Sequence, residues 1–211
     1  MKKTKGIIFV LCFLLVFGSI VQPVSAKKFN AKEAKKKVTV TYKKTSNGIL
    51  AIYKNKNKVP VKITATMHFL GSNNKDTSKE TRTNNCVSAK STATIFFRGP
   101  IDADGNYISY VGYKGSYKVQ KSKYKGYAKK ITVSSELRVI DGAFTAVNLS
   151  GKDLSNIEAT IAYYDGNDNL MGCRIQYLNC FKKNSIDQFT VDYIEGKGIP
   201  VKVKVYINTA Y

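Results

Sequence analysis

Tyrosine and lysine side chains are concentrated in one short segment of the chain. Six of the 14 tyrosines lie between Tyr107 and Tyr127, interleaved with lysines. Aromatic faces and ammonium groups held close together can bind a glycan or a polyanion through stacking and charge. The candidate residues for polyanion binding in this segment are Tyr113, Lys114, Tyr117, Lys118, Lys121, Lys123, Tyr124 and Lys125.

The composition of this segment also suits a structural role. Tyrosine is a common strand residue, and the aliphatic stems of lysines can cover aromatic rings. The segment is then the closing strand of a domain that continues into an extended, lysine-rich linker. The residues alone do not choose between a ligand platform and this structural role.

Groups suited to catalysis or metal binding are few. His68 is the only histidine and falls on the polar side of an alternating segment, so a Ser-His-Asp arrangement would depend on one exposed ring. No spacing of Cys and His matches a zinc site. The loops 102–106 and 165–169 are rich in oxygen ligands, but they lack the distal Glu of an EF-hand and suit hairpin turns. We therefore predict no catalytic residues, no metal and no cofactor.

The chain has four cysteines, of which Cys12 lies in an N-terminal apolar run. The other three, Cys86, Cys173 and Cys180, allow three pairings, each with one thiol left over. Only Cys173 and Cys180 lie in the same half of the chain, and seven residues of extended strand span more than about 20 Å, so this bridge needs a chain reversal. We expect three buried free thiols, because free cysteine behaves as a small apolar residue.

Short alternating segments separated by turns dominate the chain. Residues 61–69 alternate between apolar and polar side chains, as a half-buried strand does, and residues 157–163 repeat this alternation. Further strands are expected at 38–42, 49–53, 93–97, 117–119, 137–147, 171–178, 189–193 and 201–207. Turn residues punctuate these segments, and only the short run 31–37 has a helical pattern. This pattern predicts an all-β fold of antiparallel, immunoglobulin-like β-sandwiches.

The second half of the chain repeats the first half at an offset of 94 residues. The identical pairs are Ile63 and Ile157, Ala65 and Ala159, Thr66 and Thr160, Asn73 and Asn167, Asn85 and Asn179, Cys86 and Cys180, and Ser91 and Ser185. Such a period is too long for a solenoid unit and suits a whole small domain. We therefore expect a basic N-terminal segment at 27–37, a first sandwich at 38–127 and a second sandwich at 128–211.

One stretch of the second half resembles a known family. Residues 148–159, followed by Ile161, Tyr163, Tyr164 and Asp165, resemble the FxLYD-type domain of bacterial extracytoplasmic proteins. The family's naming motif survives at Tyr164 and Asp165, whereas the first copy keeps only its apolar alternation. The resemblance implies a small sandwich found on secreted and membrane-attached bacterial proteins, present here as a tandem repeat. It implies no catalytic residues.

The N-terminus has the layout of a secretory signal peptide over residues 1–26. Three lysines precede the apolar run 7–21, and the small residues of Val-Ser-Ala at 24–26 follow it. We expect cleavage between Ala26 and Lys27 and a protein secreted or held at the cell surface. The run is short for a bilayer span, which needs about 20 residues, but an uncleaved anchor is the alternative.

Charge separates the two halves of the chain. Residues 27–127 hold 22 Lys and Arg against five acids, and residues 128–211 hold ten against nine. The imbalance indicates that the first half meets something anionic, and for an exported chain the expected partners are an anionic cell-wall polymer or a lipid surface rather than a specific nucleic acid. A lysine-rich surface that serves only solubility is the alternative.

The function expected from these features is a secreted, non-catalytic binding or structural module of the bacterial cell envelope, with its basic first domain in contact with an anionic polymer or surface. A protein–protein interaction module that uses sandwich edges or loops is the alternative. An enzyme is the least supported class, because acid–base groups are scarce.

Overall fold

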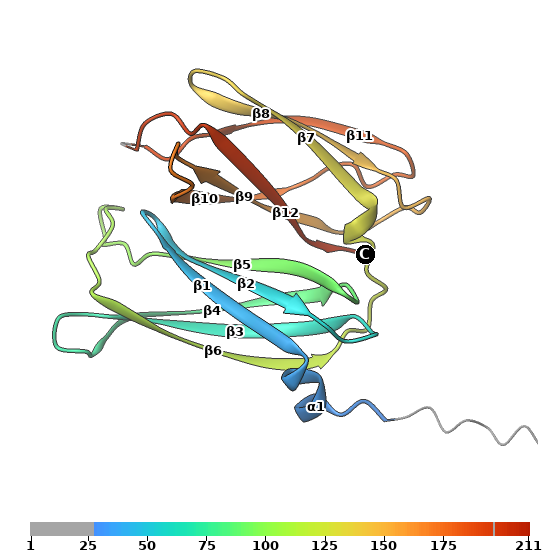
Figure 1. Ribbon diagram of the computed structural model, residues 1–211, viewed down its shortest axis with the longest axis horizontal. Helices are drawn as coiled ribbons and strands as arrows, with labels where there is room; N and C mark the ends of the chain where they lie inside the picture. The colour runs from blue at the N-terminus through green and yellow to red at the C-terminus, as the bar shows by residue number, and fades with distance from the viewer. Residues whose placement is uncertain (1–27, 196) are drawn as a thin grey trace, which may run out of the picture.

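The computed structural model describes residues 28–195 and 197–211, which form two antiparallel β-sandwiches in tandem (Figure 1). The first contains α1 (Ala31–Lys36), β1 (Val38–Thr45), β2 (Gly48–Asn55), β3 (Val61–Leu70), β4 (Asp76–Val87), β5 (Ser91–Arg98) and β6 (Gly112–Lys121). The second contains a 3₁₀ turn (Ala128–Lys130), β7 (Ile131–Leu137), β8 (Asp141–Asn148), β9 (Ile157–Tyr164), β10 (Leu170–Tyr177), β11 (Ile186–Asp192) and β12 (Lys202–Ala210). The expected signal peptide and its cleavage site lie outside the described residues.

The two sandwiches share one topology. Each is built from two three-stranded sheets, with strand orders β1-β2-β5 and β4-β3-β6 in the first and β7-β8-β11 and β10-β9-β12 in the second. Turns repeat as well: Asn74 and Asp168 both have a positive φ, of 59° and 61°, and so do Lys90 and Asn184, of 52° and 58°. Non-glycine residues rarely adopt this conformation, so its recurrence 94 residues apart marks the same turns in both copies. The prediction of an all-β tandem sandwich is confirmed.

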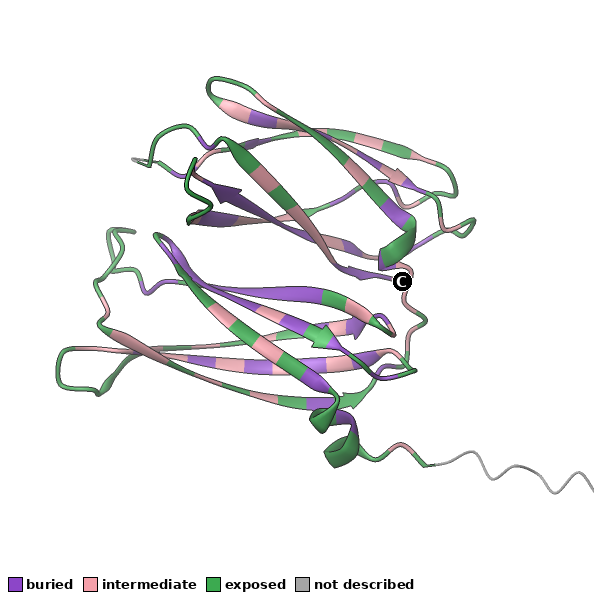
Figure 2. Ribbon diagram, in the orientation of Figure 1, coloured by how far each residue is buried: buried purple, intermediate pink, exposed green. Residues whose placement is uncertain are grey.

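Strict alternation on β3 supplies one face of the first core. Every second residue is buried, from Val61 to Phe69, and Figure 2 shows the alternation along the strand. These side chains face Ile49, Tyr53 and Phe97 from the opposing sheet. Each such burial contributes about 1.5–3 kcal/mol relative to exposure, so the alternating strand is enough to fix which side faces inward.

The sandwiches stack on each other, so that four sheets lie one above the next (Figure 1). Leu50 and Phe96, on the outer face of β1-β2-β5, pack with Ala162, Tyr164 and Cys173 of β10-β9-β12. All five are buried. A contact of this kind between sheets removes apolar surface from water at the junction.

Two buried asparagines fix the register of this junction. The Nδ2 of Asn47 donates to the carbonyl of Cys173 over 2.8 Å, and the Cys173 amide donates back to the Asn47 Oδ1. Asn208 accepts from the Thr94 amide at its side chain, over 2.9 Å, and from Asn84 at its carbonyl. A buried polar group that is left without a hydrogen-bond partner destabilises the folded state. These bonds therefore hold the two sandwiches in one relative orientation.

The strand predicted over 137–147 begins too early: β8 covers its part from Asp141 onward, and Leu137 ends β7, which was not predicted. The chain reverses between β7 and β8, where the amide of Arg138 donates to the carbonyl of Asp141. The turn carries two strongly exposed apolar residues, Val139 and Ile140, and such residues favour a strand over a turn when the sequence is read alone. The sequence pattern also gives no sign of β4, because its interior-facing side chains are polar: Ser78, Glu80, Arg82 and Asn84.

Candidate anion-binding groove

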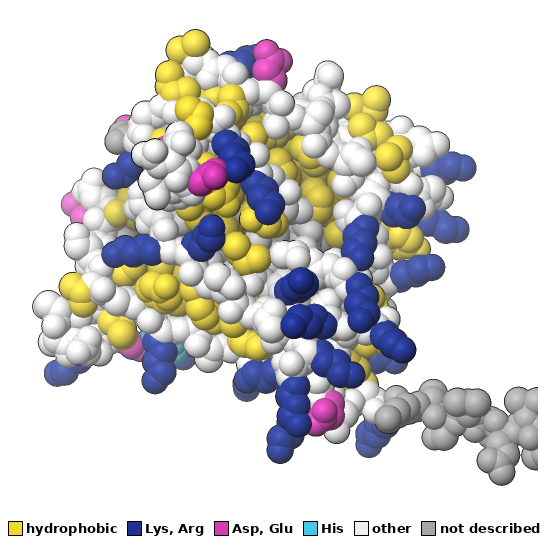
Figure 3. Space-filling view, viewed as in Figure 1, with side chains coloured by type: hydrophobic (Ala, Val, Ile, Leu, Met, Phe, Trp, Pro, Cys, Tyr) yellow, Lys and Arg dark blue, Asp and Glu magenta, His cyan; other side chains and the backbone are white. Residues whose placement is uncertain are grey.

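A groove of about 720 Å³ opens at the end of the first sandwich beside α1. Six exposed lysines line it, and we call them the groove lysines: Lys28, Lys37, Lys56, Lys58, Lys90 and Lys121. Figure 3 shows Lys and Arg side chains gathered over α1 and the neighbouring end of this sandwich. Ammonium groups converging on one groove create a positive potential that attracts anions.

Glu33 is the one carboxylate among the residues that line the groove. It forms an ion pair with Lys36, with 2.9 Å between the Nζ and the Oε1. The hydrogen bond and the charge of Lys36 hold the pKa of this carboxyl below its usual value. Glu33 therefore has a partner of its own and leaves the groove lysines without a matching carboxylate in the groove.

Backbone and amide bonds from two asparagines hold the loops that carry the lysines. The Asn55 Nδ2 lies 3.0–3.2 Å from the carbonyls of Val59, in the loop before β3, and of Val87 and Ser88, where β4 ends and the next turn begins. Asn57 donates its Nδ2 to the carbonyl of Ala34 over 3.0 Å and so ties α1 to the same loops. Both asparagines are buried, so their bonds replace water that the carbonyls would otherwise need.

The floor of the groove is partly apolar. Ala34 of α1 is buried, and Phe29 packs against the first core. Val59 is 39% exposed at the groove edge. Asn30 caps α1 by accepting a hydrogen bond from the Glu33 amide, which fixes the turn that carries these residues.

The second sandwich repeats the scaffold of the groove. Asn148 takes the place of Asn55, and its Nδ2 lies 3.0–3.3 Å from the carbonyls of Lys152, Phe181 and Lys182. The amide of Leu149 donates to the carbonyl of Lys130 over 2.8 Å. In the first sandwich, the amide of Lys56 donates to the carbonyl of Lys37 over the same distance.

The lysines themselves are only partly repeated. At the positions of Lys56, Lys58 and Lys90, the second sandwich has Leu149, Gly151 and Asn184. Lys37 keeps a lysine counterpart, Lys130. Since the same loops form with and without the charged side chains, the fold does not require them.

The structure divides the candidate segment of tyrosines and lysines among several places. Tyr113 and Tyr117 of β6 turn inward, where they make edge-on contacts with Tyr42 and Tyr53 at ring-centroid distances of 6.1 Å and 5.4 Å. The Tyr117 hydroxyl donates to the carbonyl of Val38. These rings pack against the first core, and desolvation by burial raises the pKa of Tyr117.

Lys114 and Lys118 lie on the opposite side of β6 and are exposed on the outer face of the β4-β3-β6 sheet. Lys123, Tyr124 and Lys125 belong to the connection between the sandwiches. The Tyr124 ring stacks on Tyr211 with 3.8 Å between centroids, and the Lys123 ammonium lies over the Tyr124 ring.

Of the eight candidates, Lys121 alone lines the groove. The other five groove lysines were not among the residues predicted from the sequence. A usable signal exists in the alternation of lysine and asparagine at 54–58, which places Lys56 and Lys58 in one turn. The groove as a whole could not be recognised from the sequence, because its lysines come from four separate segments that only folding brings together.

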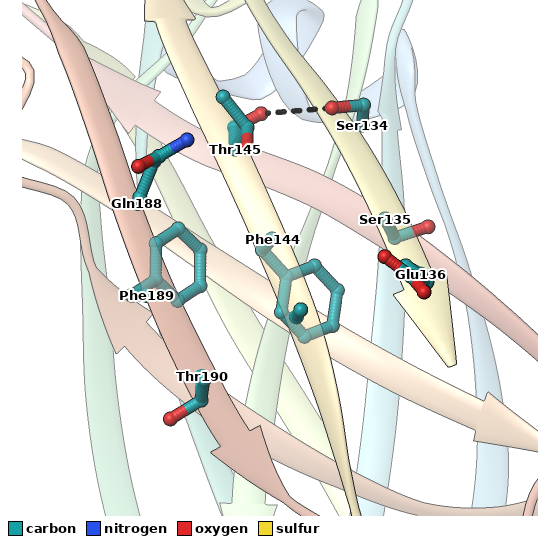
Figure 4. A pocket seen from close by; sticks show the side chains of 9 residues that line it. Ser134, Ser135, Glu136, Phe144, Thr145, Gln188, Phe189 and Thr190 are labelled. Carbon is teal, nitrogen blue, oxygen red and sulfur yellow. Dashed lines mark hydrogen bonds between the residues drawn. The ribbon is translucent and has the colours of Figure 1, made fainter. Parts of the chain in front are cut away.

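A second hollow, of about 460 Å³, lies on the β7-β8-β11 sheet. Figure 4 shows Ser134, Thr145 and Gln188 side by side on its three strands, with the Ser134 hydroxyl bonded to the Thr145 carbonyl. Its lining contains Glu136 as the single ionisable residue. This face corresponds to the one that the first sandwich buries, but small and polar residues replace the apolar ones: Ala143 stands for Leu50 and Thr190 for Phe96.

The remaining groups with chemical potential have structural partners. His68 pairs with Asp76 through its Nδ1. The carboxylates of Asp102 and Asp165 accept hydrogen bonds within their own turns. The pKa of Asp102 is lowered mainly by the backbone amide of Asn106, and that of Asp165 is lowered by the side chain and then the backbone amide of Asn169. In the described part of the chain, no group of three or more His, Cys, Asp or Glu residues is placed to hold a metal ion.

The three cysteines of the described residues are free, buried thiols, as expected. Burial raises the pKa of Cys173 to about 12. Across residues 28–195 and 197–211, no helix has the length and apolar character needed to cross a membrane.

Comparison with known proteins adds little. No protein-family model matches the sequence, and no curated protein matches it. Among solved structures, the chain is similar to red sea bream transglutaminase, with a TM-score of 0.29 and 11% sequence identity. The match covers 82% of this chain and 29% of the transglutaminase chain, so this chain spans under a third of that protein. So low a TM-score carries no argument about activity.

Proposed function

We propose that this protein is an exported, non-catalytic binding module of the bacterial cell envelope and that its first sandwich binds a polyanion through the groove lysines. One observation carries the proposal: six exposed lysines converge on a groove whose scaffold the second sandwich repeats with uncharged residues at three of the six positions. The resemblance to FxLYD-type domains supports the envelope location. The partner is an anionic wall polymer or an anionic lipid surface.

The energetics favour a ligand with many charges. An exposed ion pair contributes about 0.2–1 kcal/mol and is weakened by salt, so one small anion would bind poorly. A polymer that contacts several groove lysines adds these contributions within one molecule. Binding should therefore be strong only for repeated charge and should fall steeply as salt is raised.

Strand addition, which a protein-binding module would use, is disfavoured at β5. The Arg82 guanidinium donates to the Phe96 carbonyl over 2.9 Å, and the Thr94 amide donates to Asn208. Side chains thus occupy backbone groups that an added strand would need.

The test compares two variants with the same loss of charge. In the groove variant, Lys37, Lys56, Lys58 and Lys121 are replaced by Gln. In the control variant, Lys75, Lys79, Lys152 and Lys183, which are exposed and lie outside the groove, are replaced by Gln. Retention on purified anionic wall polymer and on anionic vesicles is measured over a range of salt.

The groove variant should elute at clearly lower salt than the unmodified protein, whereas the control variant should elute near it. The matrix that retains the protein identifies the partner class. Equal losses in the two variants would show that only net charge matters, and the proposed site would be wrong.

A further inference from the structure

A further hollow, of about 310 Å³, lies where the two sandwiches meet. Lys54, Lys90 and Thr92 line it from the first sandwich, and Lys129 and Tyr206 line it from the second. Lys90 also lines the groove. The two hollows therefore share a wall, and positive charge continues from one to the other.

The strand register shows how the path runs. Asn55 of β2 lies opposite Ser91 of β5, and Lys54 lies opposite Thr92. Lys54 and Lys56 are two residues apart along the chain, about 7 Å in extended backbone. We call the groove lysines together with Lys54 and Lys129 the basic track.

The junction that the basic track crosses is already fixed. The side chain of Asn208 accepts from both the amide and the hydroxyl of Thr94, and its Nδ2 donates to the Thr160 hydroxyl over 2.7 Å. Thr94, Thr160 and Asn208 are all buried. A ligand therefore meets a preformed path and does not have to order the two sandwiches, which lowers the cost of binding.

We infer that the ligand is a linear polymer with regularly spaced phosphate groups, long enough to bind both sandwiches along the basic track. This inference rests on the proposed function. Lysine ammonium groups bind phosphates as point charges, and none of the described residues that line either hollow is an arginine, the residue suited to bidentate recognition of a carboxylate. A linear polymer can enter a hollow between two domains, whereas the surface of a flat bilayer can contact only the rim of that hollow.

The test measures binding of the full chain to tripolyphosphate and to long-chain polyphosphate. The variant carries Lys54→Gln and Lys129→Gln, and its control carries Lys75→Gln and Lys79→Gln. The unmodified protein should bind the long chain much more tightly than tripolyphosphate. The track variant should bind the long chain about fivefold more weakly, with tripolyphosphate unaffected, because two exposed contacts are lost. The control variant should match the unmodified protein.

The outcomes separate this inference from the proposed function. If the track variant binds both probes as the unmodified protein does, the ligand stays in the groove and the inference is overturned while the proposed function stands. If it loses binding to phosphatidylglycerol vesicles as strongly as to polyphosphate, the hollow is open to a bilayer and the linear ligand is wrong. If the unmodified protein binds neither phosphates nor vesicles, both proposals fail.

Discussion

At the scale of single residues, the duplicated fold provides an internal control for the role of each lysine. Lys56 and Leu149 have the same backbone hydrogen bond, so the positive charge of Lys56 is not a requirement of the loop. A lysine kept in one copy and absent from the other points to a role beyond folding. The inward-facing tyrosines of β6 lead to the opposite conclusion, because their rings are part of the core packing.

The free thiols give a prediction at this scale. A chain produced without residues 1–26 should react slowly with iodoacetamide at pH 8 when native and should show three reactive thiols in denaturant without reductant. With its pKa raised to about 12 by burial, Cys173 is a thiolate in only about one molecule in ten thousand at that pH. A single reactive thiol in denaturant would instead reveal a disulfide.

At the scale of elements, a buried asparagine holds the loops at the same end of both sandwiches. Asn55 and Asn148 each reach three carbonyls with one amide group. The segments that each amide joins are far apart in the sequence. Local turn chemistry alone therefore could not hold them together.

Replacing either asparagine should be costly. We expect Asn55→Ala and Asn148→Ala each to lower the free energy of unfolding by about 3 kcal/mol, because buried carbonyls lose their donor. Urea denaturation of the two variants checks this, with Asn169→Ala, in an exposed turn, as the control. If either variant lost no more free energy of unfolding than the control does, that asparagine would not hold the loops together as proposed.

The sequence predicted most elements whose apolar residues alternate, although not β7, and it missed β4, whose interior-facing side chains are mostly polar. β3 and β9 were expected because their buried faces are apolar at every second residue. β4 was missed because the inward-facing side chains of Arg82 and Asn84 are polar and donate hydrogen bonds to backbone carbonyls of other strands. Such a role depends on the partner strand and leaves no local pattern.

The groove was missed for a related reason. Charge counting identified the basic half of the chain, and segment density pointed to the tyrosines and lysines of 107–127. Within a strand, alternate residues face opposite sides, so neighbours such as Tyr117 and Lys118 cannot form one platform. The groove lysines converge only after folding brings their separate segments together.

At the scale of the whole molecule, the two sandwiches form a single body through the interface of Leu50, Phe96 and Tyr164 and the bonds of Asn47 and Asn208. The outer β7-β8-β11 face carries small and polar residues at the positions that correspond to this interface. At the positions of Leu50 and Phe96 this face has Ala143 and Thr190, so it lacks the two large side chains that the first sandwich buries in the interface.

Unfolding should report this coupling. We expect one cooperative calorimetric transition for the unmodified chain. Phe96→Ala should cost about 3–5 kcal/mol, the usual cost of deleting a buried phenylalanine, and should separate the transition into two. Two transitions in the unmodified chain would show that the sandwiches unfold independently.

Lysine acetylation footprinting of the full chain, read by mass spectrometry with and without long-chain polyphosphate, tests most directly whether the groove lysines bind a polyanion. We predict protection from acetylation at Lys37, Lys56, Lys58, Lys90 and Lys121 and none at Lys75, Lys79, Lys152 and Lys183. Protection spread evenly over exposed lysines, or centred on the second sandwich, would contradict it.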